Sequence, residues 1–402
     1  MLIAGQLLLA DQGNCRIAPG MVRIADDSIV EVIVGDCSPR ADVGGPDCLI
    51  APGFIDTHLH LPQFDAIGAQ GLSLLDWLEF VIFPAEARWE IPKFAAEMTG
   101  RAIRQCLRCG TTGFCAYATV HQAAAEQALR VAQDAQIRGV IGQVLMDREA
   151  PAALCRPASQ LIAETAELLD RFPPGGRIAA AVTPRFAISC SEELLSQAGQ
   201  LADQRGAMVQ THLAENVAEC DRVRELFGGR SYVEVYREAG LLGLRTLLGH
   251  GIHLDDTDRR QLAASQARIA HCPIANTFLH SGTMNRRLLR AAGVGVTLGS
   301  DIGAGYELSM VRVARGMIEA AVSLGDPPPT AWQAWYAITA GNADQLGWSD
   351  AGRLVEGAVA DLLVIRPDIP WTDGPVDPLS RLLFSWDDRW LTEVFLRGRR
   401  VY

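Results

Sequence analysis

The stretch that decides the fold is PGFIDTHLHLPQFD, Pro52 to Asp65, in which an apolar run leads directly into two histidines. His58 and His60 are separated by one residue. Along a β-strand, residues i and i+2 point to the same side, so these two imidazoles converge at the strand end and can bind one cation. An HxH pair alone is a weak signal, and its meaning depends on what the rest of the chain places beside it.

Strand-like runs recur along the chain, and most of them are separated by segments of helical period. The eight runs are CLIAPGFIDTHLH, TTGFCAYATVH, GVIGQVLMD, RIAAAVTPRF, AMVQTHLAE, TLLGHGIH, RIAHCP and GVTLGSD. This α/β rhythm predicts a (β/α)8 TIM barrel over residues 51–351. A doubly wound sheet alternates in the same way, but it would usually carry a glycine-rich phosphate loop, and no GxGxxG or Walker sequence is present.

The two ends of the chain have a different character, with short alternating β segments such as MVRIADDSIVEVIVG and ADLLVIRPD. We expect residues 1–50 and 352–402 to combine into one small, discontinuous β-sandwich domain.

After the fourth run, Ser189 and Glu192 have capping-box spacing and Gly206 stands where a C-terminal cap belongs, which predicts a helix between them. A long insert, roughly 61–96, contains an apolar helix expected to end at Pro84, and this helix is either a lid or pocket wall or only packs on the barrel.

Composition narrows the function classes. The 402 residues carry 36 Lys+Arg and 47 Asp+Glu, so the net charge is −11, which disfavours binding to nucleic acid or an anionic membrane and favours a small-molecule substrate. Ten cysteines spread over a long chain do not form a disulfide framework of the small secreted kind. No positive charge precedes Arg16, so the N-terminus lacks the basic region of a signal peptide, and we expect a cytoplasmic protein.

A metal site is predicted at the strand ends. His212 ends the fifth run and Asp301 ends the eighth, and the C-terminal ends of barrel strands meet at one face. Together with His58 and His60 they form a set of nitrogen and oxygen ligands that suits Zn²⁺ and tolerates Fe²⁺. Lys93 is the only lysine and lies in the insert, so no strand-end lysine can bridge two metals, and a single metal per chain is expected.

Two further side chains are candidates for proton transfer and charge stabilisation. Glu215 follows His212 by three residues and can act as a proton shuttle beside the metal, although a glutamate at a helix start also favours the helix dipole. His250 follows the sixth run and can stabilise a developing oxyanion, or it is a core histidine with its hydrogen bonds satisfied. Cys106 and Cys109 form a CxxC, which we interpret as structural because no HxE accompanies it.

These residues resemble the zinc-dependent amidohydrolase superfamily, and within it the guanine deaminase family. The motifs that carry the resemblance run from about 52 to 310 and are PGFIDTHLHLPQ, LLDWLEFVIFPAEARW, GTTGFCAYATVH, VTPRFAISCS, THLAEN, HCPIANTFLHSG and LGSDIGAGYELSM. The resemblance implies metal ligands at His58, His60, His212 and Asp301, a proton shuttle at Glu215 and a water or intermediate partner at His250. It also implies a homodimer.

For the substrate, the resemblance implies that Gln63 hydrogen-bonds a purine and that Arg185 and Phe186 grip it. A guanidinium has only donors for an oxo group, and a phenyl ring offers a stacking face. A structural ion pair at Arg185 and a loop polar residue at Gln63 are the alternatives. Trp77 either walls the pocket or belongs to the core.

The implied reaction is hydrolytic deamination of guanine to xanthine, with Asp301 as the catalytic base toward water. One departure from the family pattern is Ala275, which replaces a serine in HCPIAN and bears on substrate preference. The alternatives are deamination of another fused aminoheterocycle, such as a pterin (isoxanthopterin) or 8-oxoguanine, and a non-catalytic barrel scaffold, which would be marked by a missing ligand or shuttle.

Overall fold

The computed structural model describes residues 1–35 and 41–402, and these divide into two compact units. One unit contains Met1–Asp56, Arg104–Gly113 and Glu307–Tyr402, and the other contains Thr57–Ile103 and Phe114–Tyr306. Within the described ranges, no helix combines the length and the apolar character that crossing a membrane requires.

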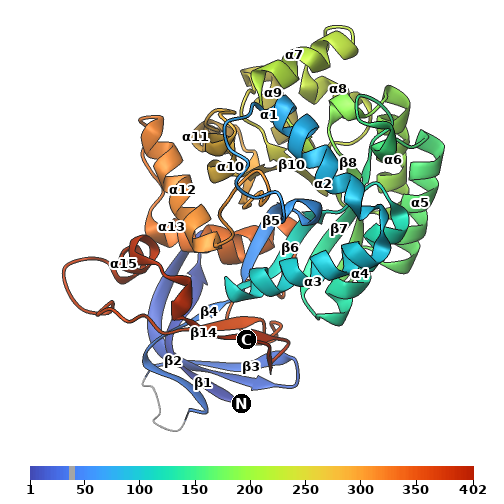
Figure 1. Cartoon of the computed structure of the whole chain (residues 1–402). Helices are drawn as coiled ribbons and strands as arrows, with labels where there is room; N and C mark the ends of the chain where they lie inside the picture. Colours follow the sequence, from blue (N-terminus) through green and yellow to red (C-terminus); the bar gives the residue numbers. More distant parts are fainter. Residues whose placement is uncertain (36–40) are drawn as a thin grey trace. The chain divides into compact units, whose positions relative to one another are not determined.

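Eight strands form the larger sheet, in the order β12-β11-β10-β9-β8-β7-β6-β5 (Figure 1). They are β5 (Phe54–His60), β6 (Thr111–Tyr117), β7 (Arg138–Leu145), β8 (Ile178–Pro184), β9 (Val209–Leu213), β10 (Thr246–His250), β11 (Arg268–His271) and β12 (Gly295–Leu298). Each of the eight predicted runs coincides with one of these strands, with only Arg138 of β7 lying outside its run, so the predicted barrel is confirmed. Strands such as β8, IAAAVTP, are buried along their whole length, because parallel strands covered on both faces need continuous apolar sequence.

Contacts between the first and last strands join the two ends of this sheet. The Thr57 hydroxyl donates to the Leu298 carbonyl at 3.0 Å, and the Asp301 amide donates to the His58 carbonyl at 2.7 Å. A Cβ on Gly299 would lie 2.6 Å from the His58 Cβ, so only glycine allows this approach. The barrel therefore brings the C-terminal ends of β5 and β12 together.

Helices alternate with the strands. In chain order they are α1 (Leu74–Trp77), α2 (Phe83–Ala87), α3 (Pro92–Arg108), α4 (Gln122–Asp134), α5 (Ala158–Arg171), α6 (Glu192–Arg205), α7 (Val217–Leu226), α8 (Tyr232–Glu238), α9 (Asp256–Ser265), α10 (Pro273–Phe278), α11 (Arg286–Ala291), α12 (Met310–Ser323), α13 (Ala331–Tyr336), α14 (Asn342–Leu346) and α15 (Pro378–Ser385). The predicted helix before Gly206 is α6, and Gly206 caps it in the left-handed conformation at φ 62°.

The start of α6 differs from the prediction. Its N-cap is Ser191, whose hydroxyl accepts from the Leu194 amide, and the capping box predicted at Ser189 and Glu192 is wrong. Ser189 instead belongs to the short 3-10 turn Ala187–Ser189, where its hydroxyl donates to the Phe186 carbonyl at 3.3 Å. Spacing alone did not distinguish the two serines.

The insert is also built differently from the expectation. The helix does not end at Pro84: α1 continues through the π-helical turn Leu78–Ile82 into α2, and Pro84 lies in the first turn of α2. Pro84 removes one backbone N–H from this continuous helix, and it stands directly after the π-helical turn, where the regular hydrogen-bond pattern of the α-helix is already interrupted.

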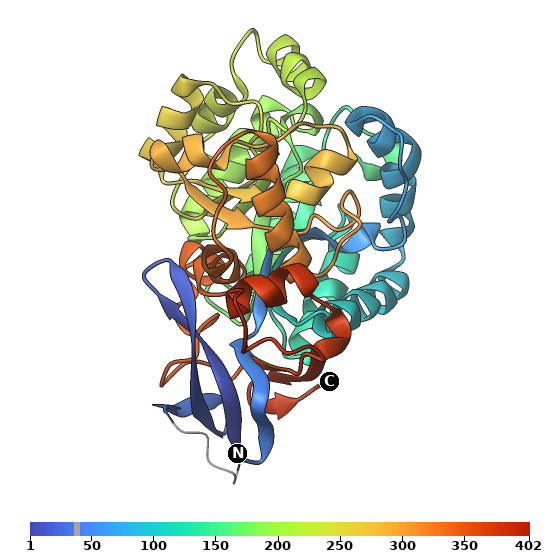
Figure 2. The ribbon, with the colours of Figure 1, turned by 90° about the vertical axis from the view of Figure 1, so that its left-hand side faces the viewer.

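The smaller sheet has seven strands in the order β15-β14-β13-β4-β1-β2-β3. They are β1 (Leu2–Asp11), β2 (Asn14–Ala25), β3 (Ser28–Val34), β4 (Val43–Pro52), β13 (Leu362–Ile365), β14 (Leu391–Leu396) and β15 (Arg399–Arg400). Figure 2 shows the N-terminal and C-terminal segments of this unit side by side, as β4 pairs antiparallel with β13. The two chain ends therefore form one β unit, as expected, with mixed parallel and antiparallel pairing. The limits placed at residues 50 and 352 stay a prediction.

Candidate active site

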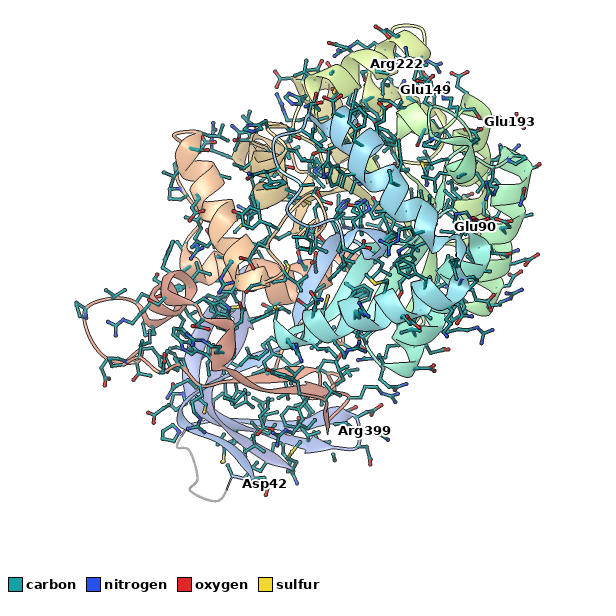
Figure 3. The ribbon with its side chains drawn as sticks, in the orientation of Figure 1. Asp42, Glu90, Glu149, Glu193, Arg222 and Arg399 are labelled. Carbon is teal, nitrogen blue, oxygen red and sulfur yellow. The ribbon has the colours of Figure 1, made fainter. Side chains whose placement is uncertain are left out.

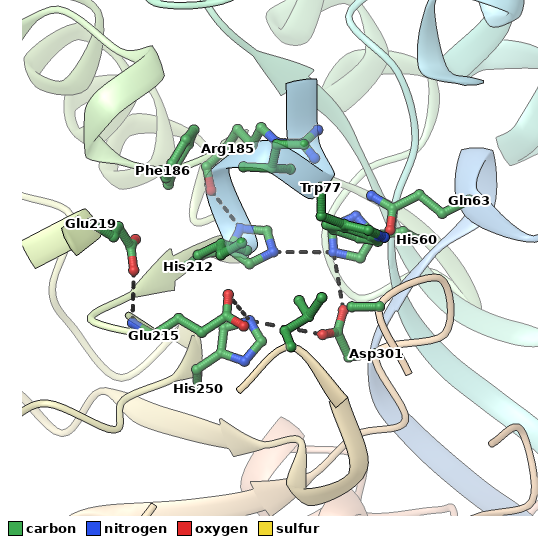
Figure 4. Close-up of a pocket in the computed structure, with 14 residues that line it drawn as sticks. His60, Gln63, Trp77, Arg185, Phe186, His212, Glu215, Glu219, His250 and Asp301 are labelled. Carbon is green, nitrogen blue, oxygen red and sulfur yellow. Dashed lines mark hydrogen bonds and ion pairs between the residues drawn. The ribbon is translucent and has the colours of Figure 1, made fainter. Parts of the chain in front are cut away.

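Five side chains converge where the barrel strands end. His58 and His60 lie in β5, His212 in β9 and His250 at the end of β10, and Asp301 follows β12. Figure 4 shows His60, His212, His250 and Asp301. All five are buried except His212, which is partly buried. The structure thus brings together the four side chains predicted as metal ligands, together with His250.

The donor atoms of the four predicted ligands have the spacing of a metal site. The Nε2 atoms of His60 and His212 are 3.1 Å apart, and Asp301 Oδ1 lies 3.4 Å from both His58 Nε2 and His60 Nε2. Ligand atoms at 2.0–2.1 Å from a tetrahedral zinc ion are about 3.3 Å from one another. The residues present therefore fit a divalent cation of this size.

Electrostatics favour the ligand form of the histidines. Burial lowers the pKa of His58, His60 and His212 well below the usual value, so each imidazole is neutral and offers a lone pair. His212 Nδ1 donates to the Arg185 carbonyl at 2.6 Å, which directs its Nε2 lone pair toward the other ligands.

Strained backbone places two of these side chains. His250 has φ +69° and Asp301 has φ +50°, both in the left-handed region that side-chain-bearing residues rarely adopt. Such strain persists only where surrounding contacts enforce it, and the Asp301 amide is fixed by the His58 carbonyl. Both side chains line the same cavity.

Glu215 is held beside the predicted ligands. The Ser281 hydroxyl donates to Glu215 Oε1 at 2.8 Å, and Glu215 Oε2 lies 3.3 Å from His250 Nε2. Burial, and next the charge of Asp301, raise the pKa of Glu215 to about 8, against the opposing effect of the Ser281 hydrogen bond. A carboxyl group with this pKa can both hold and release a proton near neutral pH.

His250 has a defined orientation. Its Nδ1 lies 2.9 Å from Asn276 Oδ1, and because an amide oxygen only accepts, Nδ1 carries the hydrogen. Nε2 faces Glu215 Oε2 and, at 4.0 Å, Asp301 Oδ2.

The residues predicted to contact substrate line the same cavity. Gln63, Trp77, Arg185 and Phe186 surround it together with His60, His212, Glu215, His250 and Asp301. Arg185 is buried and pairs with the buried Glu86, whose oxygens lie 2.7 and 2.6 Å from Nη1. The structural ion pair considered for Arg185 therefore exists, and the same side chain still reaches the cavity. Ala275 is fully buried and does not line the cavity.

Sequence reasoning missed four polar residues at this site. Glu86 pairs with Arg185, Ser281 with Glu215, and Asn276 with His250. Glu219 accepts from the Glu215 amide at 2.8 Å and from the Tyr232 hydroxyl at 2.7 Å. Asn276 and Ser281 were visible in HCPIANTFLHSG, whereas Glu86 and Glu219 lie on helices where an acidic residue is ordinary.

The barrel and its strand-end histidines and aspartate define a hydrolase class, and comparison with known proteins agrees. The chain belongs to the amidohydrolase family, whose family model matches residues 49–401. The predicted superfamily resemblance is therefore confirmed.

Guanine deaminases are among its relatives. Guanine deaminase of Dictyostelium discoideum is 34% identical over 369 residues, covering 88% of this chain and 82% of the relative. The structure is similar to that of Escherichia coli guanine deaminase, with a TM-score of 0.93 and 31% identity over 100% of this chain and 99% of the other. It is equally similar, at 28% identity and with the same coverage, to guanine deaminase from C. acetobutylicum with guanine bound in the active site.

Proposed function

We infer that this chain catalyses the hydrolysis of guanine to xanthine and ammonia. The observation that carries this inference is one buried cavity lined by three predicted metal ligands, Glu215 and the Arg185–Phe186 pair. The relatives at 34% and 31% identity are guanine deaminases, which supports the same substrate class. Water adds to C2 of guanine, the bond from C2 to the exocyclic nitrogen breaks, and that nitrogen leaves as ammonia.

We propose that His58, His60, His212 and Asp301 hold a single divalent cation. Nitrogen and oxygen ligands at this spacing suit Zn²⁺, while Fe²⁺ has compatible ligand chemistry. Such a cation, when bound, lowers the pKa of water toward about 7 and polarises the reacting centre.

The protein's own residues move the protons. Asp301 accepts a proton from the attacking water, consistent with a pKa that burial raises to about 6. Glu215 delivers a proton to N3 of guanine. It then takes the proton of the hydroxyl group that has added to C2 and passes it to the departing amine, and the proton on Asp301 returns to Glu215. His250, fixed by Asn276, hydrogen-bonds the oxygen that adds to C2. Each proton transfer contributes about 10²- to 10⁴-fold in rate.

We propose that the residues on the other side of the cavity bind the purine ring. The guanidinium of Arg185 donates to the 6-oxo group, Phe186 stacks on the ring, Gln63 hydrogen-bonds the ring edge and Trp77 walls the pocket. Because these groups are buried, a ligand that leaves one of them unpaired loses affinity.

A substrate panel tests the proposal. Guanine, 8-oxoguanine and isoxanthopterin share an amino-amidine edge and an oxo group, so their kcat/KM values, measured by ultraviolet absorbance and ammonia release, rank them directly. We expect guanine to have the highest kcat/KM. A higher value for either of the others would reassign the substrate, and no turnover of any would favour the scaffold.

We also propose an oligomeric state, a cellular location and a metabolic role for the enzyme. A homodimer, a cytoplasmic location and a role in purine catabolism are proposed from the family resemblance alone. Size-exclusion chromatography with light scattering measures the first directly, and a monomer at micromolar concentration would contradict it.

A further inference from the structure

A buried carboxylate contacts both Gln63 and Arg185, two of the residues predicted to bind the substrate. Glu86, on α2, is 1% exposed, and its side chain contacts two of the predicted purine-binding residues. Both carboxylate oxygens lie within 2.7 Å of Arg185 Nη1, and Oε1 accepts from Gln63 Nε2 at 3.1 Å. Figure 4 shows Gln63 and Arg185 on one side of the cavity.

The contact with Gln63 fixes the orientation of its amide. A carboxylate only accepts, so Gln63 must present its nitrogen to Glu86 and direct its oxygen elsewhere. That oxygen has no hydrogen-bond partner in the described parts of the chain, although it is buried. Gln63 is thereby set as a hydrogen-bond acceptor, which selects an N–H donor on a ligand.

The contact with Arg185 fixes the guanidinium in the same way. Nη1 is occupied by Glu86, which leaves the other N–H groups to donate to a ligand. The Arg185 Cζ also lies 5.6 Å from the centroid of the Phe83 ring, one turn before Glu86 on α2. One helix therefore holds the guanidinium by both charge and ring contact.

We propose that Glu86 is a positioning residue that sets the hydrogen-bonding pattern of the substrate pocket. It orients Arg185 as the donor and Gln63 as the acceptor, so that the pocket pairs with a heterocycle carrying an oxo group and a ring N–H. This inference rests on the proposed deamination of guanine. Glu86 touches no reacting atom in this assignment and acts only through its two partners.

The test is Glu86→Gln, which keeps the shape of the side chain but removes its charge and adds an N–H donor beside Arg185. The loss of a charged hydrogen-bond partner predicts that kcat/KM for guanine falls about 10- to 100-fold, mostly through a higher KM. Metal content, read by atomic absorption, stays unchanged. The matched control is Glu90→Gln, an exposed glutamate of the same insert that is labelled in Figure 3, and it keeps the wild-type kcat/KM.

A double-mutant cycle distinguishes the positioning role from a general loss of activity, because removing one member of a buried ion pair leaves a buried charge and removing both does not. Arg185→Gln is combined with Glu86→Gln, which removes both charges. If Glu86 acts through Arg185, the loss in kcat/KM of the double variant is far smaller than the product of the two single losses.

The outcomes separate the two proposals. Wild-type protein that forms no xanthine from guanine overturns the proposed function, and this inference with it. Wild-type protein that turns over guanine, combined with Glu86→Gln within twofold of its kcat/KM or with multiplicative losses in the double variant, overturns the positioning role alone.

Discussion

At the scale of single residues, the chemistry depends on how neighbours hold Glu215. Its two oxygens have different partners, since Ser281 occupies Oε1 and Oε2 faces His250. Because Oε1 already accepts from Ser281, we expect Oε2 to be the oxygen that carries the transferred proton. Replacing Glu215 and replacing Ser281 are therefore expected to have different effects on catalysis.

Glu215→Gln removes the only proposed group that carries a proton to N3. We expect kcat to fall by about 10²- to 10⁴-fold while the metal content stays at the wild-type level. Steady-state kinetics with guanine measure kcat, and metal analysis of the same sample measures the metal content. Glu193→Gln, an exposed glutamate of α6 labelled in Figure 3, is the matched control, and near-wild-type kcat in Glu215→Gln would refute the shuttle.

Ser281→Ala removes a hydrogen bond that lowers the pKa of Glu215 from where burial alone would place it. The Glu215 pKa therefore rises, and the carboxyl group stays protonated to higher pH. Because Glu215 acts as an acid in the reaction, the alkaline limb of the kcat–pH profile shifts to higher pH. We also expect kcat at neutral pH to fall about 10-fold, because the hydrogen bond that holds Glu215 is lost. The measurement is kcat as a function of pH between pH 6 and 10 for both proteins. An alkaline limb that shifts to lower pH in Ser281→Ala would contradict the prediction.

Part of this residue-level arrangement was visible in the sequence. His58 and His60 are separated by one residue and Glu215 follows His212 by three, so local spacing indicates their proximity. Glu86 and Arg185 are 99 positions apart, and no local pattern marks their contact. A pair formed only by the tertiary fold leaves no periodic signal, which is why Glu86 was missed.

At the scale of elements, the loops that follow the strands place the site. The loop after β12 brings Gly303 against Gln63, and a Cβ on Gly303 would lie 2.4 Å from both Gln63 Cβ and Gln63 Oε1. Gly303 also has φ +118°, a conformation that only glycine adopts easily. The position of Gln63 in the cavity thus depends on a glycine in another element.

Gly303→Ala is therefore expected to displace Gln63 and raise the KM for guanine at least about 10-fold, with about 1–3 kcal/mol of lost stability from backbone strain. Gly206→Ala is the control: Gly206 has φ +62° at the end of α6, and no neighbouring atom lies within 4 Å of the place that a Cβ would take, so the variant shares the strain without the contact. Thermal unfolding and guanine kinetics are measured on both. Equal KM values in the two variants would show that the contact is unimportant.

Element boundaries were less predictable than the elements themselves. The sequence around Pro84 predicts a helix end, yet the helix continues past it, because the π-helical turn Leu78–Ile82 leads directly into α2 and Pro84 is the second residue of α2. Likewise, two serines have suitable positions near the start of α6, and Ser191 was selected because Asp147 accepts from its amide and hydroxyl. Tertiary contacts decided both cases.

At the scale of the whole molecule, the order of strands was the most predictable feature. Barrel strands such as β8 are largely apolar runs because both of their faces are buried, so composition and the flanking turns reveal them without knowledge of their neighbours. The pairing of β4 with β13 joins residues more than 300 positions apart, and the similar β character of the two ends was its only sequence signal. The fold then explains why chemistry-bearing residues from β5, β9, β10 and the loop after β12 meet.

The most direct test of metal-dependent guanine deamination is to follow guanine turnover in the protein as purified, after chelation, and after Zn²⁺ is restored to one equivalent per chain. We expect one xanthine and one ammonia for each guanine consumed, loss of turnover on chelation and recovery with Zn²⁺. Undiminished turnover in metal-free protein, or unchanged guanine in the metal-loaded protein, would contradict the proposed chemistry.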